Sequence, residues 1–463
     1  MSGETGSWWG AHLLARGPAT AVWARTPEKL TLGHLRSGIA GVADSLASQG
    51  IGPGSTVALN MPQGLTAVYA LLAVWALGAQ AILIDHRSAG AEVERILGLC
   101  RAQFLVRAQE VPKKASAVLA DEHAIRIDRR GSGSPAEDDV CLVQFSSGSM
   151  GVPKAIGRSP ASLLAEIDRY ANLEGMPGPS ERLVLLNSLF HTMGLVGGLL
   201  HGLNTGVELV FPTRVNPEAV VQAAIQARAQ AIFGVPVHFD LISRMRHDAL
   251  PALRLAVSAG EILPPEVYDR FADTFTTTVR PVYGTTETGL IAADLTRDCR
   301  PPCVGRPVHD MRVKTNDGQV LVALERNPYL YLDQPGRYER GWLRTFDRGQ
   351  LEPESGHLSI LGRADAVVVI GGLKVDLGEV EAVLRQHPEV RETVVVFDRS
   401  IEAYVGADRS LTADDLADWC RDRLSDYKIP RLFHLAAAVP RNPNGKIIRS
   451  PELLRAAYRS IHN

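Results

Sequence analysis

The stretch TVALNMPQGLTAVYALLAVWALGAQAILID, residues 56–85, alternates between two hydrophobic patterns. Residues 56–61 form a short apolar run, residues 64–79 form a longer apolar segment, and residues 81–85 return to a short run. Unbroken apolar runs on either side of a helical segment are typical of parallel strands that are buried on both faces. The stretch therefore predicts a strand, a helix and a second strand of an α/β domain.

The alternation continues beyond this stretch. Residues 89–108 predict a helix and a strand, and a second series of strands and helices extends from residue 161 to residue 284. The polar segment 113–139 is expected to be a surface connection. Short runs separated by turn signals at residues 313–360 predict an antiparallel section. The predicted fold class is α/β, with a large N-terminal domain of stacked α/β subdomains and a β-rich section.

A smaller domain is predicted at the C-terminal end. Residues 376–379, Asp-Leu-Gly-Glu, supply a helix N-cap and its reciprocal glutamate ahead of an apolar face. The remaining strands and helices are expected to complete an α+β domain of ordinary size. We place the division between residues 362 and 365, which gives domains 1–362 and 365–463.

Composition restricts the class of partner. The chain has 463 residues and a formal net charge of −2, which provides no field to attract nucleic acid or an acidic membrane. Apolar runs are too short to span a bilayer, and no secretory signal is visible. The five cysteines are odd in number and widely spread, which favours a reducing cytoplasm. Cys299 and Cys303 are expected to be loop or core thiols, since no histidine or second cysteine pair lies at zinc-ligand spacing.

The segment SSGSMGVPK, residues 146–154, has the composition of a phosphate-binding loop. Only eight of the 49 cationic residues are lysines, and Lys154 follows the serines and glycines after Pro153. Glycines permit the positive φ angles that turn backbone N–H groups toward one anion, and Ser and Lys add donors and charge. The nucleotide-binding P-loop pattern is not met. Taken alone, such a segment is more often an ordinary loop.

The segment VYGTTETG, residues 282–289, places an aromatic ring, hydroxyls and a carboxylate after a predicted strand. Tyr283 could stack on a base, Thr286 could donate to a phosphate, and Glu287 could bind the magnesium ion that accompanies a triphosphate. The alternative is a strand end with a hydroxyl-rich turn.

The order of the motifs along the chain is more specific than any one of them. After these two segments come GWLRTFDRG (341–349), GRAD (362–365), GGLKVDLGEVE (371–381), LSDYKIP (424–430) and NPNGKIIR (442–449), while LFHTMGL (189–195) and VSAGEILP (257–264) lie between them. This series, from about residue 56 to residue 449, resembles the adenylate-forming superfamily in its acyl- and aryl-CoA ligase branch. Peptide-synthetase adenylation domains and beetle luciferases are other members.

The resemblance implies an enzyme that uses ATP and Mg²⁺. A carboxylic acid attacks the α-phosphate, pyrophosphate leaves, and a thiol then displaces AMP from the acyl adenylate. Thr286, Glu287 and Lys446 would be catalytic, and Glu287 would also hold the metal. The implied ATP-binding residues are Ser146, Ser147, Gly148, Ser149, Gly151, Lys154, Gly260, Glu261, Tyr283, Gly284, Thr285, Thr286, Asp347, Arg363 and Lys446.

The resemblance also implies that the small C-terminal domain is a mobile lid that rotates between the two half-reactions about Asp365. In one state Lys446 neutralises two anions, the substrate carboxylate and the α-phosphate, which must approach within bonding distance. In the other state Gly371, Gly372 and Lys374 line a channel for the thiol. Asp365 could instead be an ordinary surface or capping residue.

Three residues depart from the family pattern. Met150 stands where the family usually has a second hydroxyl, which predicts a weaker contact to the terminal phosphates. Phe346 replaces the glycine that usually precedes the ribose-binding Asp347, which predicts an altered loop. Pro281 replaces an asparagine that faces adenine in many members, so recognition there would depend on backbone groups.

The motif LFHTMGL resembles the version found in acyl- and aryl-CoA ligases, without the aspartate that selects amino acids. It implies a neutral, aromatic or medium-sized apolar carboxylic acid. The acid would contact His191, Met193, Val235, His238, Ser258, Ala259, Gly284 and Leu290.

For the thiol, coenzyme A is the first expectation. One alternative acceptor is a separate carrier protein that is loaded through its phosphopantetheine arm. Another is an amine that captures the acyl group as an amide. A non-catalytic nucleotide-binding regulator is disfavoured, because a binder has no use for Lys446. The alternative for His238, favoured for this residue taken alone, is helix packing or a surface contact.

Overall fold

The computed structural model describes the chain except for residues 1–7, 87, 89, 110–121, 137–138, 147–153, 215, 246–249, 298, 332–335, 364–366, 371–372, 408–409, 425–427, 443–444 and 463. The chain divides into two compact units. The first comprises Met1–Val313, Val322–Leu343 and Glu352–Ser359, and the second comprises Lys314–Leu321, Arg344–Leu351 and Ile360–Asn463. The domain division at residues 362–365 falls partly on undescribed residues and stays a prediction.

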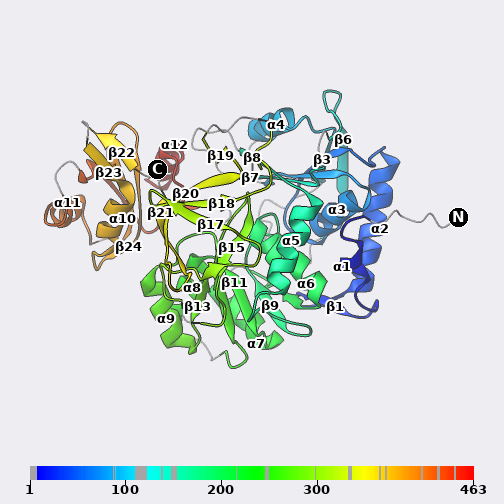
Figure 1. The fold of residues 1–463 in the computed structure, drawn as a ribbon, viewed down its shortest axis with the longest axis horizontal. Coiled ribbons are helices and arrows are strands. Elements are labelled where there is room, and N and C mark those ends of the chain that lie inside the picture. Colours follow the sequence, from blue (N-terminus) through cyan, green and yellow to red (C-terminus); the bar gives the residue numbers. More distant parts are fainter. Residues whose placement is uncertain are drawn as a thin grey trace. The chain divides into compact units, whose positions relative to one another are not determined.

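A seven-stranded sheet forms one layer of the first unit (Figure 1). Neighbouring strands are parallel except for the edge pair β1 and β2. In spatial order the strands are β13 (Val279–Pro281), β12 (Leu255–Ser258), β11 (Ala231–Gly234), β9 (Arg182–Leu185), β10 (Glu208–Val210), β1 (Val22–Arg25) and β2 (Lys29–Thr31). Because these strands are parallel, their carboxyl ends meet at one edge, which is where open α/β sheets bind ligands.

A six-stranded sheet forms a second layer. Its central strands are parallel and its two edge strands are antiparallel to their neighbours. The order is β6 (Ile125–Arg129), β5 (Phe104–Ala108), β3 (Thr56–Asn60), β4 (Gln80–Leu83), β7 (Leu142–Ser146) and β8 (Lys154–Arg158). Strand β6 lies within the segment that the sequence predicted to be a surface connection. The prediction was wrong there because a half-exposed edge strand needs little apolar sequence.

Helices cover these sheets, and the α/β fold class is confirmed. Helix α3 is buried along almost its whole length, as its uniformly apolar sequence requires, and it packs along α2 (Figure 1). Side chains of Thr31, Ser159 and Asn216 cap the first turns of α2, α5 and α7. The helices of this unit are α1 (Ala11–Ala15), α2 (Leu32–Ser48), α3 (Leu65–Ala76), α4 (Gly90–Leu99), α5 (Pro160–Ala171), the π-helix η1 (Met193–Leu200), α6 (His201–Thr205), α7 (Pro217–Ala227), α8 (Pro236–Ser243) and α9 (Pro265–Phe275).

Antiparallel strands follow the seven-stranded sheet, and the section predicted to be antiparallel, residues 313–360, contains such a pairing of Tyr338 with Leu343 and Glu339 with Trp342. A three-stranded sheet contains β14 (Tyr283–Thr285), β15 (Gly289–Ala293) and β16 (Arg306–Pro307). A five-stranded sheet has the order β17 (Val313–Asn316), β18 (Gln319–Ala323), β20 (Trp342–Leu351) and β19 (Tyr338–Glu339), and β21 (Leu358–Arg363) also pairs with β20.

The second unit has its own core around helix α10 (Leu377–Arg385). Apolar side chains of α10 pack with those of β24 (Val390–Phe397), β25 (Ile401–Ala407) and α11 (Ala413–Arg421). Strand β26 (Leu432–Ala436) joins this sheet in parallel to β25, while β22 (Val367–Ile370) and β23 (Leu373–Asp376) form a hairpin. Helix α12 (Pro451–His462) supplies Leu454 and Tyr458 to a second cluster.

The cysteines differ from the expectation in one respect. Cys299 and Cys303 are joined by a disulfide, whereas Cys100, Cys141 and Cys420 are free and buried. The sequence predicts separate loop or core thiols, which is wrong because the loop between β15 and β16 brings their Cα atoms to 5.5 Å. Within the described ranges, no helix has the length and apolar character needed to cross a bilayer.

Candidate active site

The carboxyl edge of the seven-stranded sheet gathers most of the residues predicted to contact the acid. Strand β11 ends next to Val235 and β12 ends at Ser258, and Gly234 pairs with Ser258. The Ala259 N–H donates to the Gly234 carbonyl at 3.1 Å, which continues the register beyond the strand ends. Ser258 and Ala259 are almost fully buried. The Ser258 hydroxyl has no hydrogen-bond partner among the described residues, so a buried polar atom is left at this edge.

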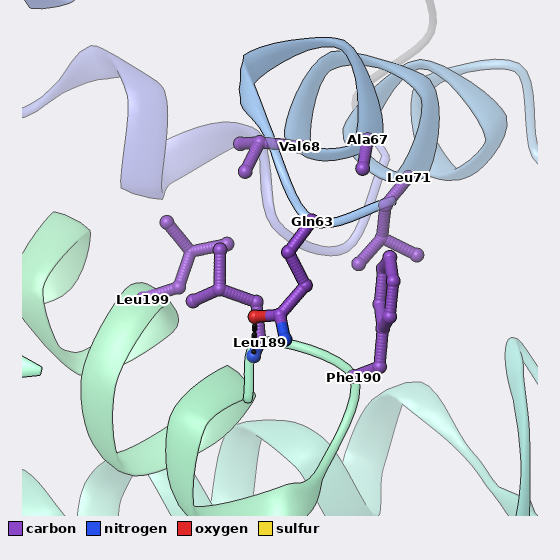
Figure 2. Close-up of a pocket in the computed structure, with 7 residues that line it drawn as sticks. All are labelled: Gln63, Ala67, Val68, Leu71, Leu189, Phe190 and Leu199. Atoms are coloured by element: carbon purple, nitrogen blue, oxygen red, sulfur yellow. Dashed lines mark hydrogen bonds between the residues drawn. The ribbon is translucent and has the colours of Figure 1, made fainter. Parts of the chain in front are cut away.

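Strand β9 ends at the same edge and leads into the loop that carries His191. Two glutamine side chains fix this loop. Gln63 Oε1 accepts a hydrogen bond from the Leu189 N–H at 2.9 Å, and Gln144 Nε2 donates to the Phe190 carbonyl at 2.8 Å. Figure 2 shows Gln63 reaching this loop from the segment that precedes α3. The backbone directly before His191 is therefore held by two side chains.

Figure 2 also shows an apolar crevice beside this loop. Its walls come from α3, from the loop and from the π-helix η1. The crevice is too narrow to hold a water molecule. Its side chains are therefore closely packed, and they support the loop. It is lined by Gln63, Ala67, Val68, Leu71, Leu189, Phe190 and Leu199.

Met193 begins the π-helix η1. π-Helices are rare in proteins, and those that occur often lie at functional sites. A Cβ atom at Gly194 would lie 2.0 Å from the Ser188 carbonyl oxygen, so only glycine lets the helix start this close to the loop. The Tyr170 hydroxyl lies 3.3 Å from Met193 Sδ and donates to it. Met193 is thereby fixed next to the His191 loop.

His238 lies in the first turn of α8. Its Nδ1 accepts from the Val235 N–H at 3.2 Å, and therefore caps the helix. This local contact matches the alternative considered from the sequence, in which His238 serves the helix itself. The same bond fixes Val235 at the sheet edge.

The segment after β13 is a tight hairpin between β14 and β15. Gly284 pairs with Leu290 and Thr285 pairs with Gly289, so Thr286 and Glu287 lie at the tip and are partly exposed. A Cβ atom at Gly284 would lie 2.6 Å from the Gly289 carbonyl oxygen, which leaves no space for a side chain. The Thr285 and Thr288 hydroxyls are 3.0 Å apart.

A tyrosine that the sequence interpretation missed contacts the tip of the hairpin. The Tyr329 hydroxyl donates to Glu287 Oε1 at 2.9 Å. Burial, with the nearby negative charge of Glu287 as the second cause, raises the pKa of Tyr329 well above its ordinary value. The tyrosine is therefore a permanent donor at neutral pH. It lies in the connection between β18 and β19, where no motif marks it.

A buried ion pair supports the same hairpin from behind. Glu166 on α5 accepts from Arg158 Nη2 at 2.7 Å and from the Leu290 N–H at 3.2 Å. The two charged side chains are 0% and 3% exposed. Burial raises the pKa of Glu166, and Arg158 acts in the opposite direction. Gly289 has a φ of 73°, and a Cβ atom there would lie 2.2 Å from the carboxyl group.

One sequence signal could have found Glu166. Leu163, Ile167 and Tyr170 form the buried face of α5, and Glu166 lies on that face. A carboxylate in the apolar stripe of an amphipathic helix needs a buried partner. The sequence alone does not show which arginine supplies it.

The predicted adenine-side residues also lie at this edge. Gly260 and Glu261 follow β12 after Ala259, and Gly260 has a φ of 91°, which favours glycine. The Val282 N–H donates to the Ser258 carbonyl at 2.9 Å, which places Tyr283 next to the end of β12. Tyr283 is 9% exposed.

In the second unit Asp347 and Arg363 form an ion pair. Arg363 Nη1 lies 3.0 Å from Asp347 Oδ1 and also donates to the Thr345 carbonyl at 3.3 Å. Phe346 has a φ of 61°, a conformation that is costly for a bulky residue. This backbone geometry gives a physical reason for the glycine that the family usually has at this position.

Lys446 lies on a tight turn of the second unit. Its backbone N–H donates to Asn442 Oδ1 at 2.9 Å, and the Asn442 N–H donates to the Lys446 carbonyl at 2.7 Å. Gly445 has a φ of 78°, and Arg441 Nη1 donates to the Gly445 carbonyl at 2.7 Å. The backbone beneath the predicted catalytic lysine is thus well fixed, and its side chain is partly exposed.

Several predicted residues cannot be placed. The loop residues Ser147, Gly148, Ser149, Met150 and Gly151 lie outside the described part of the chain. Ser146 and Lys154 pair across the β7–β8 hairpin, on either side of that loop. In the second unit Asp365, Gly371 and Gly372 also lie outside the described residues, and the side chain of Lys374, on β23, is not described. The roles predicted for all of them stay predictions.

The parallel sheet edge, the hydroxyl-rich hairpin and the separate small unit define the class of adenylate-forming enzymes. The model of the AMP-binding enzyme family matches residues 12–328, and that of the AMP-binding enzyme C-terminal domain matches residues 379–446. The chain belongs to the AMP-binding enzyme family, and the superfamily predicted from the sequence is confirmed.

Similar proteins include ligases of aromatic acids. The chain is 28% identical over 480 residues to a p-hydroxybenzoic acid–AMP ligase of Mycobacterium tuberculosis, covering 95% of this chain and 68% of that protein. It is 27% identical over 491 residues to a 4-chlorobenzoate–CoA ligase of Arthrobacter, covering 95% and 92%. Like these relatives, the chain is an AMP-forming ligase by family.

Solved structures share the fold. The anthranilate CoA ligase in complex with anthranoyl-AMP has a TM-score of 0.79 at 23% identity, with 98% of both chains covered. The O-succinylbenzoate coenzyme A synthetase of Bacillus subtilis, in complex with AMP, has a TM-score of 0.79 at 22% identity, with 96% and 97% covered.

Proposed function

We propose that this enzyme activates an aromatic or medium-sized apolar carboxylic acid with ATP and transfers the acyl group to coenzyme A. The observation that carries the proposal is the group of buried, uncharged side chains at the carboxyl edge of the seven-stranded sheet. Met193, Val235, Ala259 and Ser258 lie there, all at most 9% exposed. These four side chains accommodate an apolar acid and offer one buried hydroxyl, and none of the four can pair with a substrate ammonium group.

The relatives support the same class of substrate. Two of them are named for benzoic acids, p-hydroxybenzoate and 4-chlorobenzoate. The remaining predicted contacts, His191, His238, Gly284 and Leu290, lie on the loop after β9, on α8 and on the β14–β15 hairpin. A flat ring would thus be bounded by fixed backbone.

The hairpin tip fits the phosphate chemistry of the first step. Thr286 would donate to the α-phosphate, and Glu287 would hold Mg²⁺. The atoms at this tip that could bind a metal are all oxygens, from a carboxylate and threonine hydroxyls. Oxygen is the ligand type that Mg²⁺ prefers. The ion, when bound, would neutralise charge on the triphosphate.

Lys446 would act on the reacting groups themselves. The carboxylate oxygen attacks the α-phosphorus, the bond to the pyrophosphate oxygen breaks, and negative charge builds up between the two anions. An ammonium group at that point stabilises the transition state more than the ground state. Asp347 would bind the ribose hydroxyls, and its ion pair with Arg363 fixes the carboxylate.

The second step needs access for a thiol. We propose that domain 365–463 acts as a mobile lid with Asp365 as its hinge, and that Gly371, Gly372 and Lys374 line the pantetheine channel. A hinge needs only a few residues that can change φ and ψ. ATP and coenzyme A as substrates favour a cytoplasmic location.

Loading of a separate carrier protein or amide formation remains the alternative outcome for the acyl group. Pyrophosphate release measured with a panel of carboxylic acids identifies the acid, and mass spectrometry with coenzyme A present identifies the product. We expect benzoic acids to stimulate release and an acyl-CoA to accumulate. Release without any acyl-CoA would refute coenzyme A as the acceptor, and no release with any acid would refute the proposed activity.

A further inference from the structure

The loop between β15 and β16, residues 294–305, brings together three side chains that can bind metal. Cys299 and Cys303 lie on this loop, and His357 lies directly before β21. One ligand atom from each of the three lies within 4.8 Å of the other two. All three belong to the first unit. The histidine is 54 positions from the second cysteine, which is why sequence spacing did not suggest it.

The backbone around the cysteines is fixed by several hydrogen bonds. The Gly305 N–H donates to Cys299 Sγ at 3.1 Å, a contact that stabilises negative charge on sulfur. Two backbone hydrogen bonds join the end of this loop to Leu358. The Val304 N–H donates to the Leu358 carbonyl, and the Leu358 N–H donates to the Gly305 carbonyl, both at 2.8 Å. The loop therefore stays close to His357 by means other than the disulfide.

Close packing adds a second restraint. A Cβ atom at Gly305 would lie 2.1 Å from the Ala293 carbonyl carbon, so the two ends of the loop touch. Cys303 forms an isolated antiparallel bridge with Ser359. The three ligands are thus carried by backbone that is already in place, which is the requirement for a preorganised metal site.

A carboxylate lies behind the histidine. Asp294 Oδ2 is 3.8 Å from His357 Nε2, while Asp294 Oδ1 accepts from the backbone N–H groups of Thr296 and Arg297 at 3.1 and 2.9 Å. A metal-bound histidine almost always has such an outer partner, which fixes its tautomer and orientation. A disulfide alone has no use for an imidazole and a carboxylate at this position.

We propose that the reduced cysteine pair and His357 form a Zn²⁺ site. A small thiol such as glutathione reduces the disulfide: two thiols are oxidised to one disulfide, and Cys299 and Cys303 each gain a hydrogen. Binding of Zn²⁺ then releases two protons as the thiolates form. The C-x₃-C spacing and the S₂N donor set suit zinc, and a water molecule completes the tetrahedron.

The site would be structural. It lies at the end of β15, the strand that begins at Gly289 in the candidate active-site hairpin, and it would fix the loop between β15 and β16. Cys299 is buried, whereas the His357 side chain is 23% exposed, so the ion can enter from the histidine side. The inference uses only these residues and does not depend on the proposed substrate.

The test uses the full chain, reduced with a phosphine and kept free of oxygen. Co²⁺ is titrated first, because thiolate ligands give it a strong near-ultraviolet charge-transfer band, and bound Zn²⁺ is then counted by elemental mass spectrometry. We expect one ion per chain in the wild type and in Cys100→Ser, a matched control with a buried free cysteine. Cys303→Ser should lose the band.

His357→Gln separates the imidazole from the thiolates and keeps a polar side chain. We expect it to weaken Co²⁺ binding at least ~10-fold, the lower end of what loss of even an outer partner costs. If the reduced wild type shows no charge-transfer band, or if Cys303→Ser retains it, the pair is only a disulfide and the proposal is wrong. An unchanged affinity in His357→Gln would exclude the histidine and likewise overturn the site.

Discussion

Tyr329 donates a hydrogen bond to Glu287, with 2.9 Å between the phenol oxygen and Oε1. Glu287 is the residue proposed to hold Mg²⁺, and it lies at the tip of the β14–β15 hairpin. The tyrosine is buried while the glutamate is partly exposed. The tyrosine therefore fixes one carboxylate oxygen, and we propose that the other binds the metal.

Tyr329→Phe removes this bond and keeps the ring. A hydrogen bond to a charged group contributes about 1.5–3 kcal/mol, part of which water would replace. We expect the Mg²⁺ concentration for half-maximal pyrophosphate release to rise roughly 5–10-fold, with a smaller change at saturating Mg²⁺. Tyr338→Phe is the matched control, because its hydroxyl donates to the Leu324 carbonyl. An unchanged Mg²⁺ dependence in Tyr329→Phe would refute the role of this bond.

Lys446→Ala tests the proposed catalytic lysine. Loss of one stabilising charge at a transition state costs on the order of 10²–10³ in rate, so adenylate formation should fall by that factor. The reaction of a chemically supplied acyl adenylate with coenzyme A should be retained, because that step does not join two anions. Lys29→Ala, an exposed lysine on β2, serves as the control. Equal loss of both half-reactions in folded protein would exclude the assigned role.

The buried pair Arg158–Glu166 should be important for stability. Glu166→Gln leaves the arginine charge unpaired where its side chain is 3% exposed. Breaking a buried pair in this way costs about 3–5 kcal/mol, measured as the free energy of unfolding in urea. Asp269→Asn breaks the exposed pair with Arg300 and should cost less than about 1 kcal/mol. Similar costs for the two variants would contradict the importance of burial.

The sheets and most helices could be predicted from the sequence because buried parallel strands leave a clear apolar pattern. The pattern fails where tertiary contacts decide. Strand β6 is polar and depends on its pairing with β5. Likewise, the π-helix η1 depends on the close approach of Gly194 to Ser188, which periodicity does not show.

Thr286, Glu287 and His191 could be proposed from the sequence because they lie within motifs, and their roles stay predictions. The support of the candidate site was not predictable, because Tyr329 and Glu166 reach the hairpin from distant segments. The departure at Phe346 was visible in the sequence, but its meaning required the φ angle of 61°. Contacts across long sequence separations carry no local signal, and this limits what one sequence can show.

His201 provides a test of pH-dependent stability. Its ring is 1% exposed, and Nε2 lies 3.2 Å from the Pro177 carbonyl, which can only accept, so Nε2 carries the proton. Burial lowers the pKa of His201 to about 4 from an ordinary 6.5. Between these pH values the unfolded chain binds a proton that the folded chain does not. The free energy of unfolding should therefore fall as the pH is lowered through this window.

His201→Gln keeps an N–H donor that can reach Pro177 and removes the titration. One pKa unit corresponds to about 1.4 kcal/mol, so the wild type should lose ~3 kcal/mol relative to the variant between pH 7 and the acid side of the window. Urea unfolding at pH 7, 5.5 and 4 measures this difference. The wild type should be the more stable protein at pH 7, and its advantage should shrink steadily toward pH 4. A constant difference across the three pH values would mean that the folded protein protonates His201 as readily as the unfolded chain does.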